Sequence, residues 1–235
     1  MASKAGLSQA LFRGANAWLG WMRGGTAMAA IAGCAGFGAV CGSSLATAST
    51  MGRVALPELE KYRYSGALAT GTLAAGGVLG ILIPPSAGFV IYAILTEESI
   101  GRLFLAGVIP GILLASMFML TIFIQTAFKP KIGPAARRYD WAEKRVALGR
   151  AMSILSIIVI SIGGIYGGVF TPVEASAVGA VLAIFFAALR RKFSPKILRS
   201  ALLNTVNTTV MIYFIIIGAA IFSPFLALTQ IPDNL

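Results

Sequence analysis

The chain has 235 residues, of which 57% are hydrophobic and 11% are charged, and its mean hydropathy is +0.85. Soluble domains carry about 25% charged residues, so this composition excludes a soluble enzyme or a disordered chain and predicts a membrane protein. The 19 basic against 8 acidic residues give a net charge of +11. The basic residues lie between long apolar stretches, as expected of cytoplasmic loops, and this placement argues against nucleic-acid binding. The absence of histidine removes His-based triads and His-ligated metals.

The first two segments differ in their pattern of charge. Residues 1–23 hold spaced basic side chains between leucine and tryptophan residues, which predicts an amphipathic helix at the membrane interface. Residues 24–52 are uncharged and rich in small side chains, and a basic residue adjoins each end. This segment is too long for one upright helix and too short for two full spans. We therefore expect a re-entrant helical hairpin that enters from the cytoplasm and turns at residues 41–44, followed by a polar loop over residues 53–63.

The next two apolar segments are predicted to cross the membrane. Residues 64–96 are uncharged, but Pro84 and Pro85 lie near their middle, so we expect a broken helix. Residues 103–128 form an uninterrupted apolar run, which predicts an ordinary spanning helix. The strongly basic residues 129–150 are then predicted to form a cytoplasmic loop.

Residues 151–235 hold the last apolar segments. The stretch 151–189 suits two short helices, because Thr171, Pro172 and Glu174 have the types and spacing of a capping box that begins a second helix. Two passes bring the second basic loop, residues 190–199, back to the cytoplasmic face. Glu174 is the only charge in this stretch, and a cation ligand or gating contact is the alternative to its capping role.

Small and hydroxyl-bearing residues gather at the expected hairpin tip. Gly42 permits a tight turn, while Ser43, Ser44 and Thr47 offer hydroxyl oxygens. Two interpretations remain open for this tip taken alone. The residues either bind a ligand or serve helix packing through small side chains, which is common in membranes.

The helix break is the second candidate site, and it comprises Gly80, Ile83, Pro84, Pro85 and Ser86. The prolines remove two backbone donors and leave carbonyls that protein, water or an ion must satisfy, although a hydrogen-bonded kink is an alternative. The half-helix that follows would point its N-terminus at the gap and favour an anion. Neither segment contains an ionisable side chain. Oxygen ligands without a proton relay favour sodium coupling over proton coupling, and ligand type leaves potassium open.

The ordered motifs resemble the large membrane subunit of tripartite ATP-independent periplasmic (TRAP) transporters. In chain order they are Gly42–Ser44, LGILIPPS (residues 79–86), SIG (99–101), AGVIPG (106–111) and TPVEA (171–175). The resemblance covers essentially the whole chain. It implies an all-α, polytopic, elevator-type fold with inverted repeats, in which residues 24–128 are the first transport half and residues 151–235 begin the second repeat.

This resemblance also implies a function. It implies sodium-driven import of organic acids, such as C4-dicarboxylates, across the bacterial inner membrane, with a small membrane subunit and a periplasmic substrate-binding protein as partners. No cofactor and no enzyme activity is expected, with Na⁺ as the coupling ion. Gly42, Ser43, Ser44 and Thr47 at the tip, and the five residues of the break, would enclose one sodium ion and one edge of the substrate site.

The sequence departs from the family pattern at a few places. Thr47 stands where an aspartate is frequent, and Gly76 and Gly77 stand where serines are frequent, which removes a charged contact and two hydroxyls. Because family members are longer at both ends, we expect this chain to be a fragment of a permease. A channel-like or structural membrane subunit without coupled transport is the alternative function.

Overall fold

The computed structural model describes residues 6–189 and 194–229, and within these ranges the regular structure is helical throughout. The α-helices are α1 (Leu7–Leu19), α2 (Gly25–Cys41), α3 (Ser44–Lys61), α4 (Gly66–Leu82), α5 (Ala87–Thr96), α6 (Ile100–Phe128), α7 (Trp141–Tyr166), α8 (Pro172–Leu189) and α9 (Pro195–Thr229). A short 3₁₀ turn, η1 (Pro130–Ile132), follows α6. Predictions for residues 1–5, for residues 190–193 of the second basic loop and for residues 230–235 lie outside the described residues.

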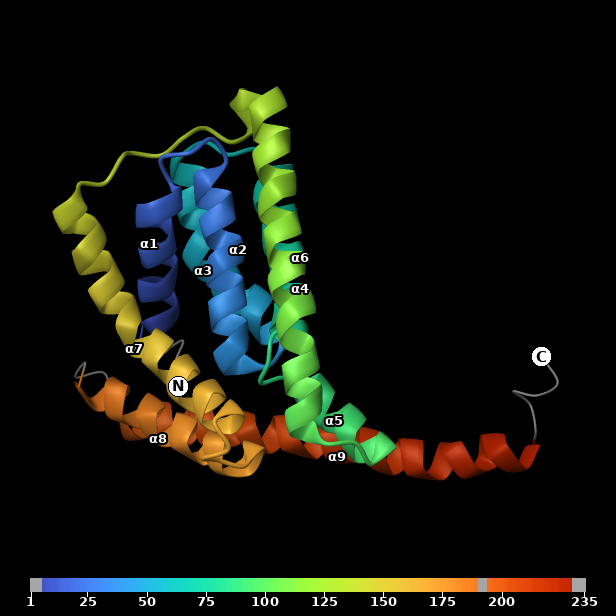
Figure 1. The fold of residues 1–235 in the computed structure, drawn as a ribbon. Coiled ribbons are helices and arrows are strands. Elements are labelled where there is room, and N and C mark those ends of the chain that lie inside the picture. Colours follow the sequence, from blue (N-terminus) through green and yellow to red (C-terminus); the bar gives the residue numbers. More distant parts are fainter. Residues whose placement is uncertain (1–5, 190–193, 230–235) are drawn as a thin grey trace.

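Helix α2 forms the centre of an upright bundle. Helices α1, α3, α4 and α6 stand around it, so that it is covered on several sides (Figure 1). Its side chains are buried almost all round, among them Ile31, Cys34 and Phe37. A helix that is apolar on every face needs such an enclosed place. The hairpin segment therefore lies inside the bundle, and neither cysteine forms a disulfide.

The predicted interfacial segment contains α1, whose apolar side packs within the bundle. Leu7, Leu11 and Phe12 are buried, and the helix lies against α2 and α7. Trp18 and Trp21 remain partly exposed near its C-terminal end. The amphipathic helix is therefore present, with its apolar face turned to protein. Its place relative to the membrane surface stays a prediction.

Helix α3 is longer than the sequence pattern suggested. It continues to Lys61, through the polar residues 53–61 that were expected to form a loop. Pro57 lies inside it and removes only one backbone donor, while Ala55 and Leu59 bury their side chains in the bundle. Burial of one face thus keeps this polar segment helical.

The helix break occurs where the prolines predicted it. Helices α4 and α5 are separated by residues 83–86 and are bent by 41°. In length and composition, α6, α7, α8 and α9 are each able to cross a membrane, and the bent pair α4–α5 adds a fifth candidate among the described residues. The all-α, polytopic fold with a helical hairpin and a discontinuous helix is confirmed.

The basic segment after α6 is only partly a loop. Residues 129–140 pass over one end of the bundle, where Gly24 N–H donates to the Gly133 carbonyl at 2.9 Å and Ala136 N–H to the Gly20 carbonyl at 2.8 Å (Figure 1). Helix α7 then begins at Trp141, so residues 141–150 are helical rather than loop. These bonds fix the segment to the α1–α2 turn.

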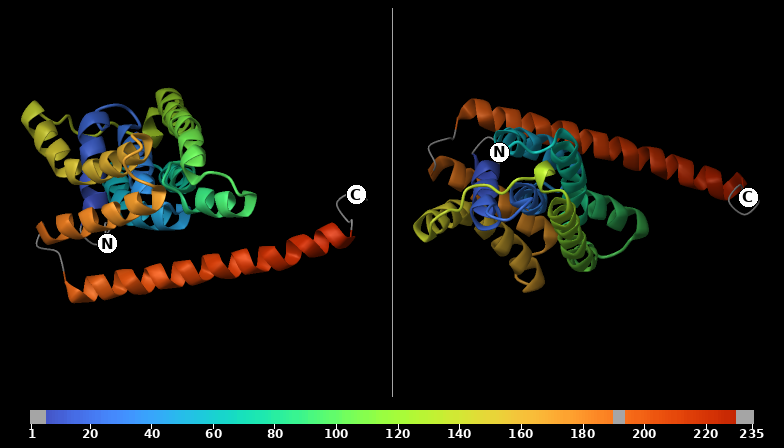
Figure 2. Two further views of the ribbon diagram at one scale, coloured as in Figure 1. Left: turned by 60° about the horizontal axis from the view of Figure 1, so that its bottom comes forward. Right: turned by 90° about the horizontal axis from the view of Figure 1, so that it is seen from above.

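The last three helices lie toward the opposite end of the bundle. Helix α7 descends to it, α8 returns beneath the bundle, and α9 projects beyond it (Figures 1 and 2). Helix α7 continues to Tyr166 in spite of Gly163 and Gly164, and the turn follows at residues 167–171. The side chains described in α9 are largely exposed.

Candidate functional site at the hairpin tip and the helix break

The hairpin tip and the helix break are in direct contact. Ala87 N–H, at the start of α5, donates a hydrogen bond to the Gly42 carbonyl at 3.2 Å. Gly42 has a φ of 64°, and a Cβ atom there would lie 2.9 Å from the Pro85 carbonyl oxygen. Both the left-handed backbone and the close approach require glycine at this position. The structure thus brings together two motifs that are about forty residues apart in the sequence.

Three helices cross at Gly80. A Cβ atom on Gly80 would lie 2.7 Å from the Ser43 carbonyl oxygen and 2.6 Å from Thr47 Oγ1. On the other side, a Cβ atom on Gly38 would lie 2.8 Å from the Gly80 Cα atom. Helices α2, α3 and α4 therefore approach here to backbone contact, which places the tip hydroxyls and carbonyls against α4.

Two hydroxyl groups, that of Thr47 at this crossing and that of Ser86 at the break, are buried without a hydrogen-bond partner. Thr47 is 0% exposed and Ser86 is 1% exposed, and neither hydroxyl oxygen is paired. The Ser43 hydroxyl accepts a hydrogen bond from Ala46 N–H at 3.4 Å and so caps α3. Ser44 follows at the first position of α3 and is half-buried. Buried hydroxyls in proteins are normally paired, so these two oxygens have a capacity for hydrogen bonds or ligation that the described residues do not use.

The break leaves backbone carbonyls without their helical donors. The carbonyls of Gly80 and Ile81 would accept from residues 84 and 85, which are prolines and have no N–H. The Ile83 carbonyl would accept from Ala87 N–H, but this group donates to Gly42 instead. The break therefore adds oxygen ligands to the hydroxyls of Thr47 and Ser86.

The N-terminus of α5 lies at the same place. Its N-cap residue, Ser86, makes no side-chain capping bond to the helix. The first N–H groups of a helix lack intrahelical partners and carry a partial positive charge. The arrangement therefore presents oxygen atoms suited to a cation next to a helix end suited to an anion.

The glycines in α4 serve close packing. A Cβ atom on Gly76 would lie 2.7 Å from Cys34 Sγ, and one on Gly77 would lie 2.8 Å from the Ala48 Cβ atom. Glycine at these two positions allows α2 and α3 to pack closely against α4. Cys34 is a small buried thiol at this contact.

Two glycines of α6, both within the AGVIPG motif, also shape the break. A Cβ atom on Gly111 would lie 2.8 Å from the Ile83 side chain, and one on Gly107 would collide with the Phe89 ring. Their spacing of four residues puts both on one helix face, and this small-residue pattern was the available signal. They let α6 support the bent pair α4–α5.

Comparison with known proteins assigns the family. A family model described as "Tripartite ATP-independent periplasmic transporter, DctM component" matches residues 1–235. The chain belongs to this TRAP transporter family. It is a large-permease chain, and the all-helical fold with several apolar spans makes it a multi-pass protein of the bacterial inner membrane.

The TRAP permease chain has relatives along almost its whole length. It is 40% identical to the C4-dicarboxylate TRAP transporter large permease protein DctM of Pseudomonas aeruginosa, over 98% of this chain and 54% of that protein. It is 36% identical to the protein of the same description in Vibrio cholerae, over 98% of this chain and 55% of the relative. It is also 34% identical to the ectoine/5-hydroxyectoine TRAP transporter large permease protein UehC of Ruegeria pomeroyi, over 93% and 51%. The chain spans about half the length of these curated relatives.

Proposed function

We propose that this chain is part of the permease subunit of a sodium-coupled secondary transporter that imports an organic acid. The observation that carries the proposal is the contact between the tip and the break. The unpaired Thr47 hydroxyl lies against Gly80, the unpaired Ser86 hydroxyl belongs to a residue beside Gly42, and the break frees backbone carbonyls. Gly42, Ser43 and Ser44 complete the tip on the other side. These groups form one sodium site and one edge of the substrate site.

Sodium is the coupling ion that the ligand chemistry favours. Hydroxyl and carbonyl oxygens are hard ligands for a small cation, and none of the nine tip and break residues is ionisable. A proton-coupled carrier needs a buried carboxyl or imidazole group to hold the proton. Coupling therefore runs through ion binding at the tip and the break.

An organic acid is the substrate class that the second half of the site favours. The uncapped N-terminus of α5 presents backbone N–H groups beside the sodium ligands, and such a helix end attracts a carboxylate. Two of the relatives named above are described as C4-dicarboxylate permeases. We therefore propose a C4-dicarboxylate or a similar carboxylate as the cargo.

Two protein partners complete the transporter. A periplasmic substrate-binding protein delivers the acid, and a small membrane subunit assembles with the permease. The basic segment 129–140 and the second basic loop face the cytoplasm, because Lys and Arg resist translocation. A cysteine placed at Arg138 in the full-length protein is expected to react with a membrane-impermeant reagent only from the cytoplasmic side. Reaction from the periplasm would contradict this orientation.

The proposed coupling is tested by reconstitution. The complete transporter in vesicles, supplied with its binding protein and radiolabelled succinate, should take up substrate against its gradient only when sodium is higher outside. A proton gradient and a potassium gradient serve as matched controls and should drive no accumulation. Accumulation that follows the proton gradient and ignores sodium would contradict the proposal. Passive equilibration under every ion condition would instead support a channel.

A further inference from the structure

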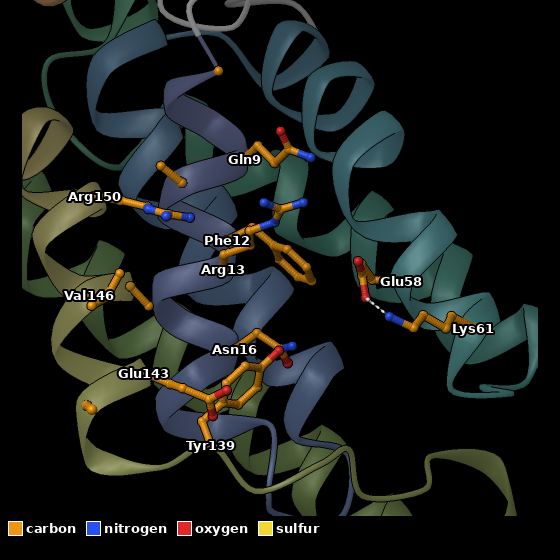
Figure 3. Close-up of a pocket in the computed structure, with 14 residues that line it drawn as sticks. Gln9, Phe12, Arg13, Asn16, Glu58, Lys61, Tyr139, Glu143, Val146 and Arg150 are labelled. Carbon is orange, nitrogen blue, oxygen red and sulfur yellow. Dashed lines mark ion pairs between the residues drawn. The ribbon is translucent and has the colours of Figure 1, made fainter. Parts of the chain in front are cut away.

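A cavity away from the tip and the break lies along α1. It has a volume of about 710 Å³ and is bounded by the C-terminal end of α3 and the first turns of α7 (Figure 3). Three basic side chains, Arg13, Lys61 and Arg150, line it together with the carboxylates of Glu58 and Glu143. A space this size, with charges from three helices, is suited to a polar ligand.

The two carboxylates already have partners. Glu58 pairs with Lys61 at 3.7 Å, and Glu143 pairs with Arg137 at 2.8 Å and accepts a hydrogen bond from Asp140 N–H at 3.0 Å. For Arg13, by contrast, no ion pair is found within residues 6–189 and 194–229. In Figure 3 its guanidinium group extends from α1 to the side of α3, next to Gln9. The cavity therefore holds a positive charge that is not neutralised from within it.

A buried amide completes the polar lining. Asn16 is only 4% exposed, and its Oδ1 atom has no hydrogen-bond partner. It lies one turn along α1 from Arg13, beside Tyr139 (Figure 3). Burial raises the pKa of Tyr139, so its hydroxyl remains a hydrogen-bond donor. A buried amide without a full set of partners indicates that a polar ligand or solvent group meets it.

The position of Arg13, an exposed side chain on α1, favours a lipid as the source of the ligand. Trp18 and Trp141 meet edge to face at 5.7 Å between ring centroids, and the Lys144 ammonium lies 5.5 Å from the Trp18 ring. Tryptophan and lysine side chains gather at the headgroup level of a bilayer. Arg13 precedes the last residue of α1, Leu19, by six positions, which places it about 9 Å below that end of the helix. An exposed guanidinium at this distance from the tryptophan pair is within reach of a lipid headgroup, which supplies an anion.

We propose that this cavity binds a phosphate group, with Arg13 as its principal ligand, and that the headgroup of an anionic phospholipid supplies it. The planar guanidinium fork matches two phosphate oxygens, and the Tyr139 hydroxyl supplies a further donor. The unpaired Asn16 Oδ1 atom can accept a hydrogen bond from a hydroxyl group of the headgroup. The nearby carboxylates of Glu58 and Glu143 disfavour a dianion. A singly charged phosphodiester, as in phosphatidylglycerol, therefore fits better than a free phosphate monoester or a dicarboxylate. This site is independent of the proposed transport function.

The proposal is tested by native mass spectrometry of the full-length permease in its complete transporter. We expect phosphatidylglycerol to stay bound through detergent exchange, and Arg13→Gln to lower the bound fraction by about tenfold. Lys131→Gln changes an exposed cation in η1 and is the matched control, with an unchanged bound fraction. Arg13→Lys keeps the charge without the fork and should retain part of the binding. Melting temperatures measured in parallel identify any variant that has lost its fold.

Two results would overturn the proposal or its lipid source. Full retention of phosphatidylglycerol by a folded Arg13→Gln variant would show that the cavity does not bind the headgroup. Displacement of the lipid by millimolar glycerol 3-phosphate would show that a soluble phosphate ester is the ligand. No displacement, together with loss of binding in Arg13→Gln, supports the phospholipid.

Discussion

Two of the helical hairpins among the described residues, α2–α3 and α7–α8, differ in how their turns are satisfied. In both, a glycine with positive φ, Gly42 at 64° and Gly168 at 69°, precedes a hydroxyl residue that starts the next helix. In the α7–α8 hairpin, Thr171 N–H donates to the Glu174 carboxylate at 2.8 Å, and Glu174 N–H donates to Thr171 Oγ1 at 3.3 Å. This capping box, which the sequence predicted, satisfies the turn from within itself.

The α2–α3 hairpin has no such internal solution. Three residues after its N-cap Ser43 stands Ala46, which offers no carboxylate in return. The Gly42 carbonyl instead accepts from Ala87 on another helix, and the Thr47 hydroxyl stays unpaired against Gly80. Gly168, in contrast, meets open space. A turn that depends on another element and keeps unpaired oxygens is suited to binding, whereas a self-capped turn is suited to holding two helices together.

The largest effect is expected when the α2–α3 tip is moved away from α4, because only this hairpin depends on contact with another helix. Gly80→Ala would place a Cβ atom within 2.7 Å of the Ser43 carbonyl oxygen, so the backbones must move apart. Overpacking of this kind costs about 1–3 kcal/mol, and we expect uptake to fall by about tenfold or more. Gly71→Ala, at an open position of the same helix, is the control and should leave uptake unchanged. Equal uptake in both variants would show that the close crossing at Gly80 is not required for transport.

A second large effect is expected when the break is removed. Replacing Pro84 and Pro85 with alanine restores two backbone donors, so α4 and α5 can join and pair the freed carbonyls. We expect about tenfold lower uptake with weaker sodium dependence, while membrane insertion is retained. Ser86→Ala should do less, because it removes one hydroxyl and keeps the backbone. Pro110→Ala, at the exposed proline inside α6, is the control. Unchanged sodium dependence in the double variant would show that the break is only a kink in helix packing and does not bind the ion.

Thr47→Val separates ion binding from packing with a smaller change. Valine keeps the shape and removes the unpaired hydroxyl, so thermal stability should be equal or higher. If the oxygen binds sodium, half-maximal uptake should require roughly threefold to tenfold more sodium, which corresponds to about 1 kcal/mol. Thr70→Val is the control, because its hydroxyl is exposed and bonds the Gly66 carbonyl within α4. An unchanged sodium requirement would exclude Thr47 as a ligand.

The smallest effect is expected in the self-capped hairpin. Glu174→Ala removes the capping carboxylate and should lower the melting temperature by a few degrees at most. Glu174→Gln should keep most of the stability, because glutamine also completes a capping box. Neither variant should change the sodium requirement for uptake. A changed requirement would mean that Glu174 takes part in ion binding or gating.

The sequence predicted those features that depend on neighbouring residues. The proline pair fixed the break at residues 83–86, and Thr171 with Glu174 fixed the start of α8, because both signals act within one helical turn. Composition likewise determined that the chain is helical and spans a membrane, since the bilayer requires internal pairing of the backbone. The ordered motifs were sufficient to indicate the family.

Other features depended on contacts between distant parts of the chain. Residues 53–61 carry enough charge to suggest a loop, yet the burial of Ala55 and Leu59 makes them part of α3. The apolar side of α1 packs against α2 and α7, a contact that the amphipathic pattern alone did not specify. In each case the pattern of polar and apolar residues shows which face of the helix is apolar, but it does not show which other helix or surface covers that face.

Sequence alone therefore determined the all-helical class, the break, the cap of α8 and the transporter family. Only the tertiary structure decided that the Gly42 turn bonds to Ala87, that Gly80 brings Thr47 and Ser43 against α4, and that a charged cavity opens beside Arg13. The physical reason is how far apart in the sequence the interacting residues lie. Caps and helix breaks are set by bonds over three or four residues, whereas a crossing of three helices depends on which glycines meet, and that is fixed by the packing of the whole bundle.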